Sequence, residues 1–144
     1  MIKKQFTLYI ENRPGNLARI TRRLAQSNIN IEGISLASSA DVGLVQVVVS
    51  NAAQTRRLLR ELDVAFTVQD VALLSLRNEP GALSRIVSRL ARHKVNVNYV
   101  YATACSTSGD ARCYCIISAP DLDKVLDAYN GGAKGKKTKP RKAS

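Results

Sequence analysis

The chain has 144 residues, 45% of them hydrophobic, with 22 basic and 11 acidic residues and a formal net charge of +11. That length and apolar content allow one ordinary domain or two very small ones, and they exclude a wholly disordered protein. No apolar run approaches the roughly 18 residues of a membrane span, and the first residues lack the apolar stretch of a signal peptide. We therefore expect a cytoplasmic protein with no membrane partner.

More than half of the charge imbalance lies in residues 131–144, which contain six basic residues and no acidic one. The remainder has 16 basic against 11 acidic residues, a net charge of +5. Residues 131–144 contain too little apolar surface to fold, so we expect a disordered basic tail. The net charge is therefore weak evidence for nucleic-acid binding by the folded part.

The cysteines, Cys105, Cys113 and Cys115, are odd in number and lie in one segment, which favours reduced thiols over a disulfide framework. His93 is the only histidine. With no other cluster of soft ligands, we expect neither a metal nor another cofactor.

An internal repeat organises the chain. A shift of 66 positions aligns residues 12–17 (NRPGNL) with residues 78–83 (NEPGAL), and the agreement continues without a gap to Ile31 and Val97. Such agreement indicates a duplication. We place the first module at residues 1–69, the second at 70–130 and the tail at 131–144.

The first module reads as a strand (6–10), a helix after the Pro-Gly turn, a hairpin (31–38 and 44–50), a helix (52–62) and a short strand (65–68). The first helix should bury one face, with apolar residues at helical spacing: Leu17, Ile20, Leu24 and Ala25. The order is βαββαβ. An α+β fold of two ferredoxin-like modules with antiparallel sheets is therefore predicted.

The second module repeats this order up to a helix at 121–129 but has no apolar run left for a last strand. Its hairpin is longer by about two residues. Its first strand (71–76) would then be a bare sheet edge, which natural proteins usually cover. We expect a strand from the first module or from another subunit to cover it.

Nothing in the sequence indicates an enzyme. It has no glycine-rich phosphate loop with lysine, no nucleophile elbow and no matched pair of carboxylates. His93 lies near a helix end and aligns with Ser27, which favours a structural role.

The Pro-Gly turn is the better candidate site. Proline suits the first turn of a helix, and glycine allows close approach of a ligand, so the amides of Gly15, Asn16 and Leu17 should be free to bind a carboxylate. We expect Asn12 and Asn30 to lie close to this turn and to bind an ammonium group. Each asparagine could instead only cap a turn or a helix, but recurrence in both modules favours a ligand.

At these residues the sequence resembles the ACT domain family, regulatory amino-acid-binding modules, over both modules. Residues 10–17 and 29–31 are similar to the serine-binding regulatory domain of phosphoglycerate dehydrogenase. That resemblance implies a ligand held between neighbouring modules by a histidine and two asparagines. The histidine is replaced by Ile10 and Leu76, which implies a more apolar site, for a branched or aromatic amino acid. The candidate ligand-binding residues are Asn12, Pro14, Gly15, Asn16, Leu17, Asn30, Ile31, Asn78, Pro80, Gly81, Ala82, Leu83, Asn96 and Val97.

The resemblance implies a homodimer that binds a small-molecule amino acid and regulates a separate enzyme of amino-acid metabolism. One alternative is the small regulatory subunit of acetolactate synthase, which uses the same module. Another is a nucleic-acid-binding protein, which the scarcity of aromatic residues disfavours.

Overall fold

The structure, a computed structural model, describes residues 1–103 and 111–131. It contains, in chain order, β1 (Ile2–Glu11), α1 (Asn16–Gln26), β2 (Ile31–Ser39), β3 (Val42–Val49), α2 (Ala52–Glu61), β4 (Ala65–Arg77), α3 (Ala82–Arg92), β5 (Tyr99–Thr103), β6 (Arg112–Ser118) and α4 (Leu122–Gly131). Residue Gly131, expected to begin the tail, belongs to α4. The rest of the tail and Cys105 lie outside the described residues.

The strands form one six-stranded sheet of order β2-β3-β1-β4-β6-β5, in which all neighbours are antiparallel. The α+β prediction is confirmed. The two expected strands at 65–68 and 71–76, however, are one continuous strand, β4, which ends the first module and begins the second. The proposed division after residue 69 falls within this strand. The chain does not turn there because Gln69 and Asp70 continue the ladder opposite Gln5 and Lys4.

The start of β1 covers the edge that the second module would otherwise expose. Ile2 pairs with Ala72, and Met1 exchanges two backbone hydrogen bonds with Leu73, of 2.8 and 2.9 Å. The cover comes from the first module, one of the two sources expected. It ends at Leu73, so the backbone of Ser75 on that side has no strand neighbour among the described residues.

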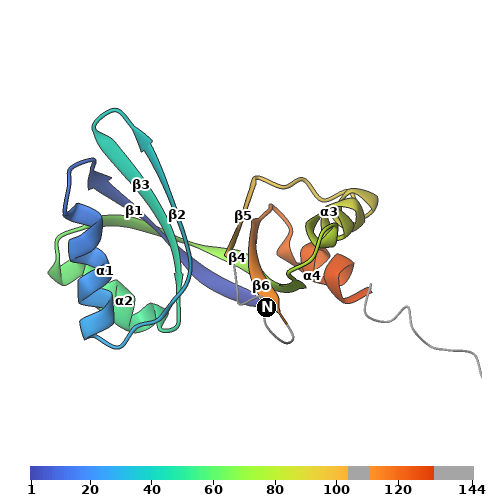
Figure 1. Ribbon diagram of the computed structural model, residues 1–144, viewed down its shortest axis with the longest axis horizontal. Coiled ribbons are helices and arrows are strands. Elements are labelled where there is room, and N and C mark those ends of the chain that lie inside the picture. Colours follow the sequence, from blue (N-terminus) through green and yellow to red (C-terminus); the bar gives the residue numbers. More distant parts are fainter. Residues whose placement is uncertain (104–110, 132–144) are drawn as a thin grey trace, which may run out of the picture.

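Each module has its own core on the same face of β4. Even-numbered side chains of β4 contact both cores, Phe66 and Val68 in the first and Ala72 and Leu74 in the second. Helices α1 and α2 cover one end of the sheet, and α3 and α4 cover the other (Figure 1). In α1 the predicted apolar face is only partly right, since Ile20 and Leu24 are buried, Leu17 is partly buried and Ala25 is exposed.

The opposite face of the sheet carries a third cluster, which joins the modules. Val48, Val71, Leu73 and Ile116 are buried there, with Tyr101 against them. Gly33 of β2 lies so close to this cluster that an added Cβ would stand 2.6 Å from Ile116 Cδ1. The modules therefore pack face to face as well as sharing a strand.

Beside this cluster lies a group of hydrogen-bonded side chains that we call the polar clamp: Gln5, Gln69, Tyr99 and Tyr101. Gln5 is fully buried, donates to the Tyr99 hydroxyl at 2.6 Å and accepts from the Tyr101 hydroxyl at 2.9 Å. Gln69 also donates to the Tyr99 hydroxyl. Burial raises the pKa of Tyr101, with Tyr99 as a smaller cause, so its hydroxyl stays a donor. These hydrogen bonds join β1 and β4 of the shared sheet to β5 of the second module.

The second hairpin is longer than expected. Ile34 pairs with Val47 in the first module, and Val100 pairs with Ile117 in the second. Equivalent residues of the two modules are thus 66 positions apart in the first strand of the hairpin (Ile34 and Val100) and 70 positions apart in its second strand (Val47 and Ile117). The insertion is four residues rather than about two, and it falls between β5 and β6.

Candidate functional site

The Pro-Gly turn has the same conformation in both modules. Gly15 precedes α1 with φ of 92°, and Gly81 precedes α3 with φ of 85°. These angles lie in the left-handed region that favours glycine. Neither helix start has a side-chain cap, so each leaves backbone donors available.

The amides at the first turn are only partly free. Asn16, expected to have a free amide, donates it to the Arg13 carbonyl at 3.3 Å, because the turn closes on itself. The amides of Gly15 and Leu17 have no hydrogen-bond partner in the described part of the chain. A carboxylate at this helix start would therefore find fewer donors than expected, beside a positive helix end.

A hollow of about 350 Å³ lies beside this first turn, and we call it the turn hollow. Its walls come from β1, the turn, α1 and the β2–β3 hairpin: Ile10, Glu11, Asn12, Arg13, Pro14, Gly15, Leu17, Leu36 and Gly43. An added Cβ at Gly15 would meet nothing within 4 Å. Asn12 donates its side-chain amide to Ala40 at 3.2 Å, so it anchors the hairpin and keeps its Oδ1 as an acceptor.

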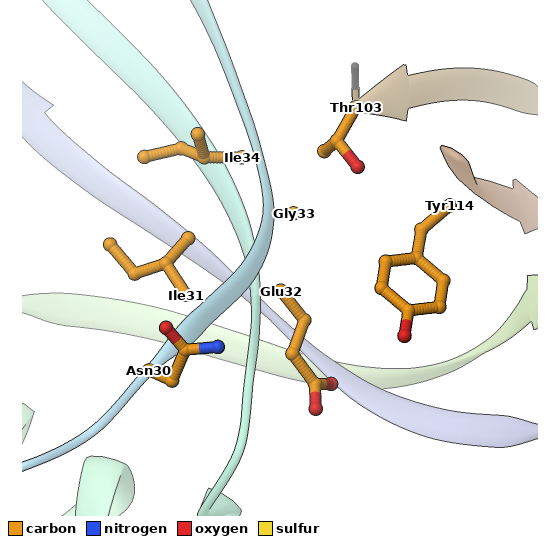
Figure 2. A pocket seen from close by; sticks show the side chains of 7 residues that line it. All are labelled: Asn30, Ile31, Glu32, Gly33, Ile34, Thr103 and Tyr114. Atoms are coloured by element: carbon orange, nitrogen blue, oxygen red, sulfur yellow. The ribbon is translucent and has the colours of Figure 1, made fainter. Parts of the chain in front are cut away.

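Asn30 does not lie near this turn, contrary to expectation. It precedes β2, after α1 ends, and the 11 residues of α1 put about 16 Å between the two helix ends. Asn30 and Ile31 line a different hollow, of about 360 Å³, between β2 and the second module's Thr103 and Tyr114 (Figure 2). We call it the junction hollow. Asn12 and Asn30 of one chain therefore cannot share one ligand.

The family model of the ACT domain pair matches residues 1–112 of the chain. The chain belongs to the ACT domain pair family. The resemblance inferred from the sequence is thereby confirmed.

Among solved structures, this ACT pair is similar to protein BT0572 from Bacteroides thetaiotaomicron, at 28% identity and a TM-score of 0.81, covering 92% of this chain and 90% of that one. The regulatory subunit of aspartate kinase from Thermus thermophilus, in its ligand-free form, matches at 18% identity and a TM-score of 0.65, covering 90% and 91%. The corresponding subunit from Thermus flavus matches at 18% and 0.60, covering 93% and 96%. At 18% identity these two show the fold alone. A search of curated proteins found no match.

The second turn of the ACT pair differs from the first. Arg85 forms an ion pair with Glu79, and an added Cβ at Gly81 would stand 3.3 Å from the Arg85 Nη1 atom. A guanidinium thus lies beside this turn. Asn78 donates its backbone amide to Ala111 at 2.9 Å, which ties the turn to the start of β6.

The remaining candidates of the second module are mostly at the surface. Pro80 and Asn96 are exposed, Ala82 is partly exposed, and Leu83 and Val97 are exposed apolar residues. Ala82 donates its amide to Glu79 at 3.2 Å. The first module therefore offers the more open turn.

His93 has the structural role expected of it. It is the C-cap of α3, and its Nδ1 lies 2.9 Å from the Arg89 carbonyl. Within the described ranges, no three His, Cys, Asp or Glu side chains form a group that could hold a metal ion. No helix there is long and apolar enough to span a membrane.

Sequence reasoning missed Glu32, Thr103 and Tyr114, which line the junction hollow with Asn30. They come from both modules. No local motif marks them, because they meet only when the sheet folds β2 against the second module.

Proposed function

We propose that this ACT pair is a regulatory amino-acid-binding protein that binds a small amino acid at module interfaces and acts on a separate metabolic enzyme, without catalysing a reaction itself. The observation that supports this most is the open first turn. Its glycine leaves space for a ligand, the amides of Gly15 and Leu17 lack partners within residues 1–103 and 111–131, and the turn hollow, lined by the first module alone, adjoins them.

The chemistry of the turn hollow suits an amino acid with an apolar side chain. The free amides of Gly15 and Leu17 would donate to its carboxylate at the positive end of α1. Asn12 Oδ1 would accept from its ammonium group. Ile10 and Leu36 would contact an apolar side chain, which agrees with the replacement of the family's histidine by Ile10.

Exposed apolar side chains support assembly as a homodimer. Leu83 and Val87 of α3 and Val97 and Val100 at β5 are each at least 36% exposed. They lie on α3 and at the sheet edge formed by β5. A second copy that covered this edge would bury them, since such patches mark association surfaces.

A thermal-shift screen with the twenty amino acids, at cytoplasmic ionic strength, tests this function. A ligand at 100 times its dissociation constant adds about 2.7 kcal/mol of stability. We expect at least one amino acid to raise the melting temperature, and Asn12→Ala to reduce that shift. Asn78→Ala, at the second turn, where the Arg85 guanidinium lies beside Gly81, is the matched control and should retain it. If none of the twenty raised the melting temperature, the proposal would be wrong.

A further inference from the structure

We propose that the outer face of α3 is an anion site, separate from the two hollows described above, and that it takes a small phosphorylated ligand such as a phosphate ester or a diphosphate. A hollow of about 310 Å³ lies along this face, and we call it the arginine hollow. It is lined by two serines and three arginines: Ser84, Arg85, Ser88, Arg89 and Arg92. With α4, α3 covers the end of the sheet away from α1 and α2 (Figure 1).

The lining residues share one face of α3 because of their spacing. Ser84, Ser88 and Arg92 follow one another at intervals of four, and Arg85 and Arg89 form a second row beside them. Ser84 and Arg92 are thus about 12 Å apart along the helix axis. Every residue that lines the hollow is polar or charged, so this face is distinct from the exposed apolar surface of α3.

Both serine hydroxyls of the arginine hollow are available to a ligand. Serine and threonine inside a helix can donate to the carbonyl four residues earlier. Thr21 and Thr55 do so in α1 and α2, at 3.0 and 2.8 Å. Ser84 and Ser88 make no such bond and have no side-chain partner within residues 1–103 and 111–131. Each hydroxyl can therefore donate to an acceptor that lies in the hollow.

The positive charges of the hollow are only partly compensated. Arg85 is paired with Glu79, which does not line the hollow. Arg89 and Arg92 form no ion pair or side-chain hydrogen bond in the described part of the chain. Arg89 is also partly buried, which reduces the screening of its charge by solvent. The hollow therefore presents two uncompensated guanidinium groups and no carboxylate among its lining residues.

The helix dipole explains only part of this arrangement. Cations in the last turn of a helix are stabilised by its negative end, and Arg89 and Arg92 lie there. Arg85 instead lies near the positive end, where no acidic residue of α3 offsets it. Serine is a weaker helix former than alanine or arginine, so Ser84 and Ser88 do not serve the stability of α3. These residues are better explained by a ligand than by the helix alone.

The first module offers a matched comparison. The corresponding residues of α1, 66 positions earlier, are Ala18, Arg19, Arg22, Arg23 and Gln26. This face of α1 also has three arginines, but it has neither serine, and Arg23 forms an ion pair with Glu61 at 3.8 Å. The two faces therefore have the same number of positive side chains, while the paired hydroxyls and the uncompensated Arg89 belong to the second module.

A phosphoryl group matches these donors better than other anions do. A phosphate monoester carries a charge of about −1.5 to −2 and three strong acceptor oxygens, whereas a carboxylate carries one charge on two oxygens. Guanidinium groups bind phosphate oxygens through two parallel hydrogen bonds. A protein partner is disfavoured, because interface cores need apolar or aromatic anchors, and this lining has none. A nucleic-acid backbone carries only one charge per phosphate, which matches two uncompensated arginines less well.

Calorimetric titration of the full chain with inorganic pyrophosphate, at pH 7 and low ionic strength, tests this site. We expect saturable binding at the arginine hollow. Arg89→Gln combined with Arg92→Gln should weaken it about ten-fold or more, because charge-assisted hydrogen bonds are lost. Ser84→Ala combined with Ser88→Ala changes no charge and should weaken it about five-fold. Weak attraction to the basic residues of the tail is common to all variants and cancels in these comparisons.

The control is Arg19→Gln combined with Arg22→Gln on α1, which removes the same charge from the matching face. It should weaken binding less than about two-fold, since exposed charges at a distance are screened. Circular dichroism checks the fold of each variant. Alanine favours a helix more than serine does, so the serine pair decides if an arginine pair unfolds.

Three results would overturn the inference. Pyrophosphate that does not bind is the first. A serine pair without effect, or a control that weakens binding as much as the Arg89 and Arg92 pair does, would show attraction by charge alone. If the serine pair weakened binding of a duplex DNA of about 20 base pairs as much as binding of pyrophosphate, a nucleic-acid backbone would be the ligand. None of these results bears on amino-acid binding, which the thermal-shift screen tests separately.

Discussion

The polar clamp gives the most direct test of how the two modules are held together. Gln5→Met keeps the length and approximate volume of the side chain but removes its donor and its acceptor. In the structure, Gln5 bonds to the hydroxyls of Tyr99 and Tyr101. The substitution leaves Tyr99 its contact with Gln69, whereas the Tyr101 hydroxyl loses its acceptor.

The expected cost follows from those contacts. The two short hydrogen bonds contribute about 0.5–1.5 kcal/mol each, the 3.5 Å hydrogen bond from Gln5 to Thr7 contributes less, and part of this loss is offset by the more apolar methionine. A buried hydroxyl left without an acceptor costs about 1–3 kcal/mol, and the partly buried Tyr101 lies toward the lower end of that range. We therefore expect Gln5→Met to lower the free energy of unfolding by about 2–4 kcal/mol.

Urea unfolding, followed by circular dichroism, measures this free energy. Adding Tyr101→Phe to Gln5→Met removes the stranded hydroxyl, so the double variant should recover at least about 1 kcal/mol relative to Gln5→Met alone. Gln26→Met, on the exposed surface of α1, is the control and should change stability by less than about 0.5 kcal/mol. A loss below that size for Gln5→Met, or no recovery in the double variant, would refute the role of the clamp.

Three further predictions concern the shared sheet. Gly33→Ala should lower stability by about 1 kcal/mol in the same urea assay, because its Cβ would overlap the terminal methyl of the buried Ile116 side chain; an unchanged midpoint would show that this side chain moves aside freely. In native protein at pH 8, iodoacetamide should label Cys113 much faster than Cys115. Cys115 is buried, and burial, together with the nearby Cys113, raises the pKa of its thiol to about 11. Equal labelling rates at the two sites, measured by mass spectrometry, would contradict this. In amide exchange, Leu73, bonded to the start of β1, should be protected more than Ser75 beyond it, and equal protection would mean that another strand continues the cover.

The repeat predicted most of the fold, because matched turns and apolar spacing fix the same strand and helix order twice. The sequence could not predict that the modules share one strand. Gln69 and Asp70 resemble a polar break between two strands, yet both remain in the sheet. Gln69 belongs to the polar clamp through its hydrogen bond to the Tyr99 hydroxyl, and Asp70 forms an ion pair with Lys4, with an Nζ–Oδ1 distance of 2.7 Å.

Gln5 illustrates a second limit of sequence reasoning. It precedes the alternating residues Phe6 and Leu8, which are buried on the helix-covered face. A polar residue on the other face of such a strand is expected to be solvated. It is buried because the second module packs against that face, and a contact between distant parts of the chain leaves no local pattern.

The candidate site was predicted in the same partial way. The glycine turns could be recognised because their left-handed conformation requires a specific residue type. The grouping of Asn12 with Asn30 was wrong, because α1 separates them by its length. Whether a turn is open depends on contacts such as that of Arg85 with Glu79, which sequence alignment of the two modules does not show.

The clamp also limits what a ligand can do to this protein. A ligand shifts an equilibrium between two arrangements only by its difference in affinity for them. Suppose that a second arrangement, in which β5 no longer contacts β1 and β4, lacks contacts worth about 3 kcal/mol. A ligand must then bind that arrangement about 150-fold more tightly than the observed one before the two are equally populated. A ligand that contacted both modules in the observed arrangement would act in the opposite direction. Such a ligand would therefore make the observed arrangement of the two modules more rigid.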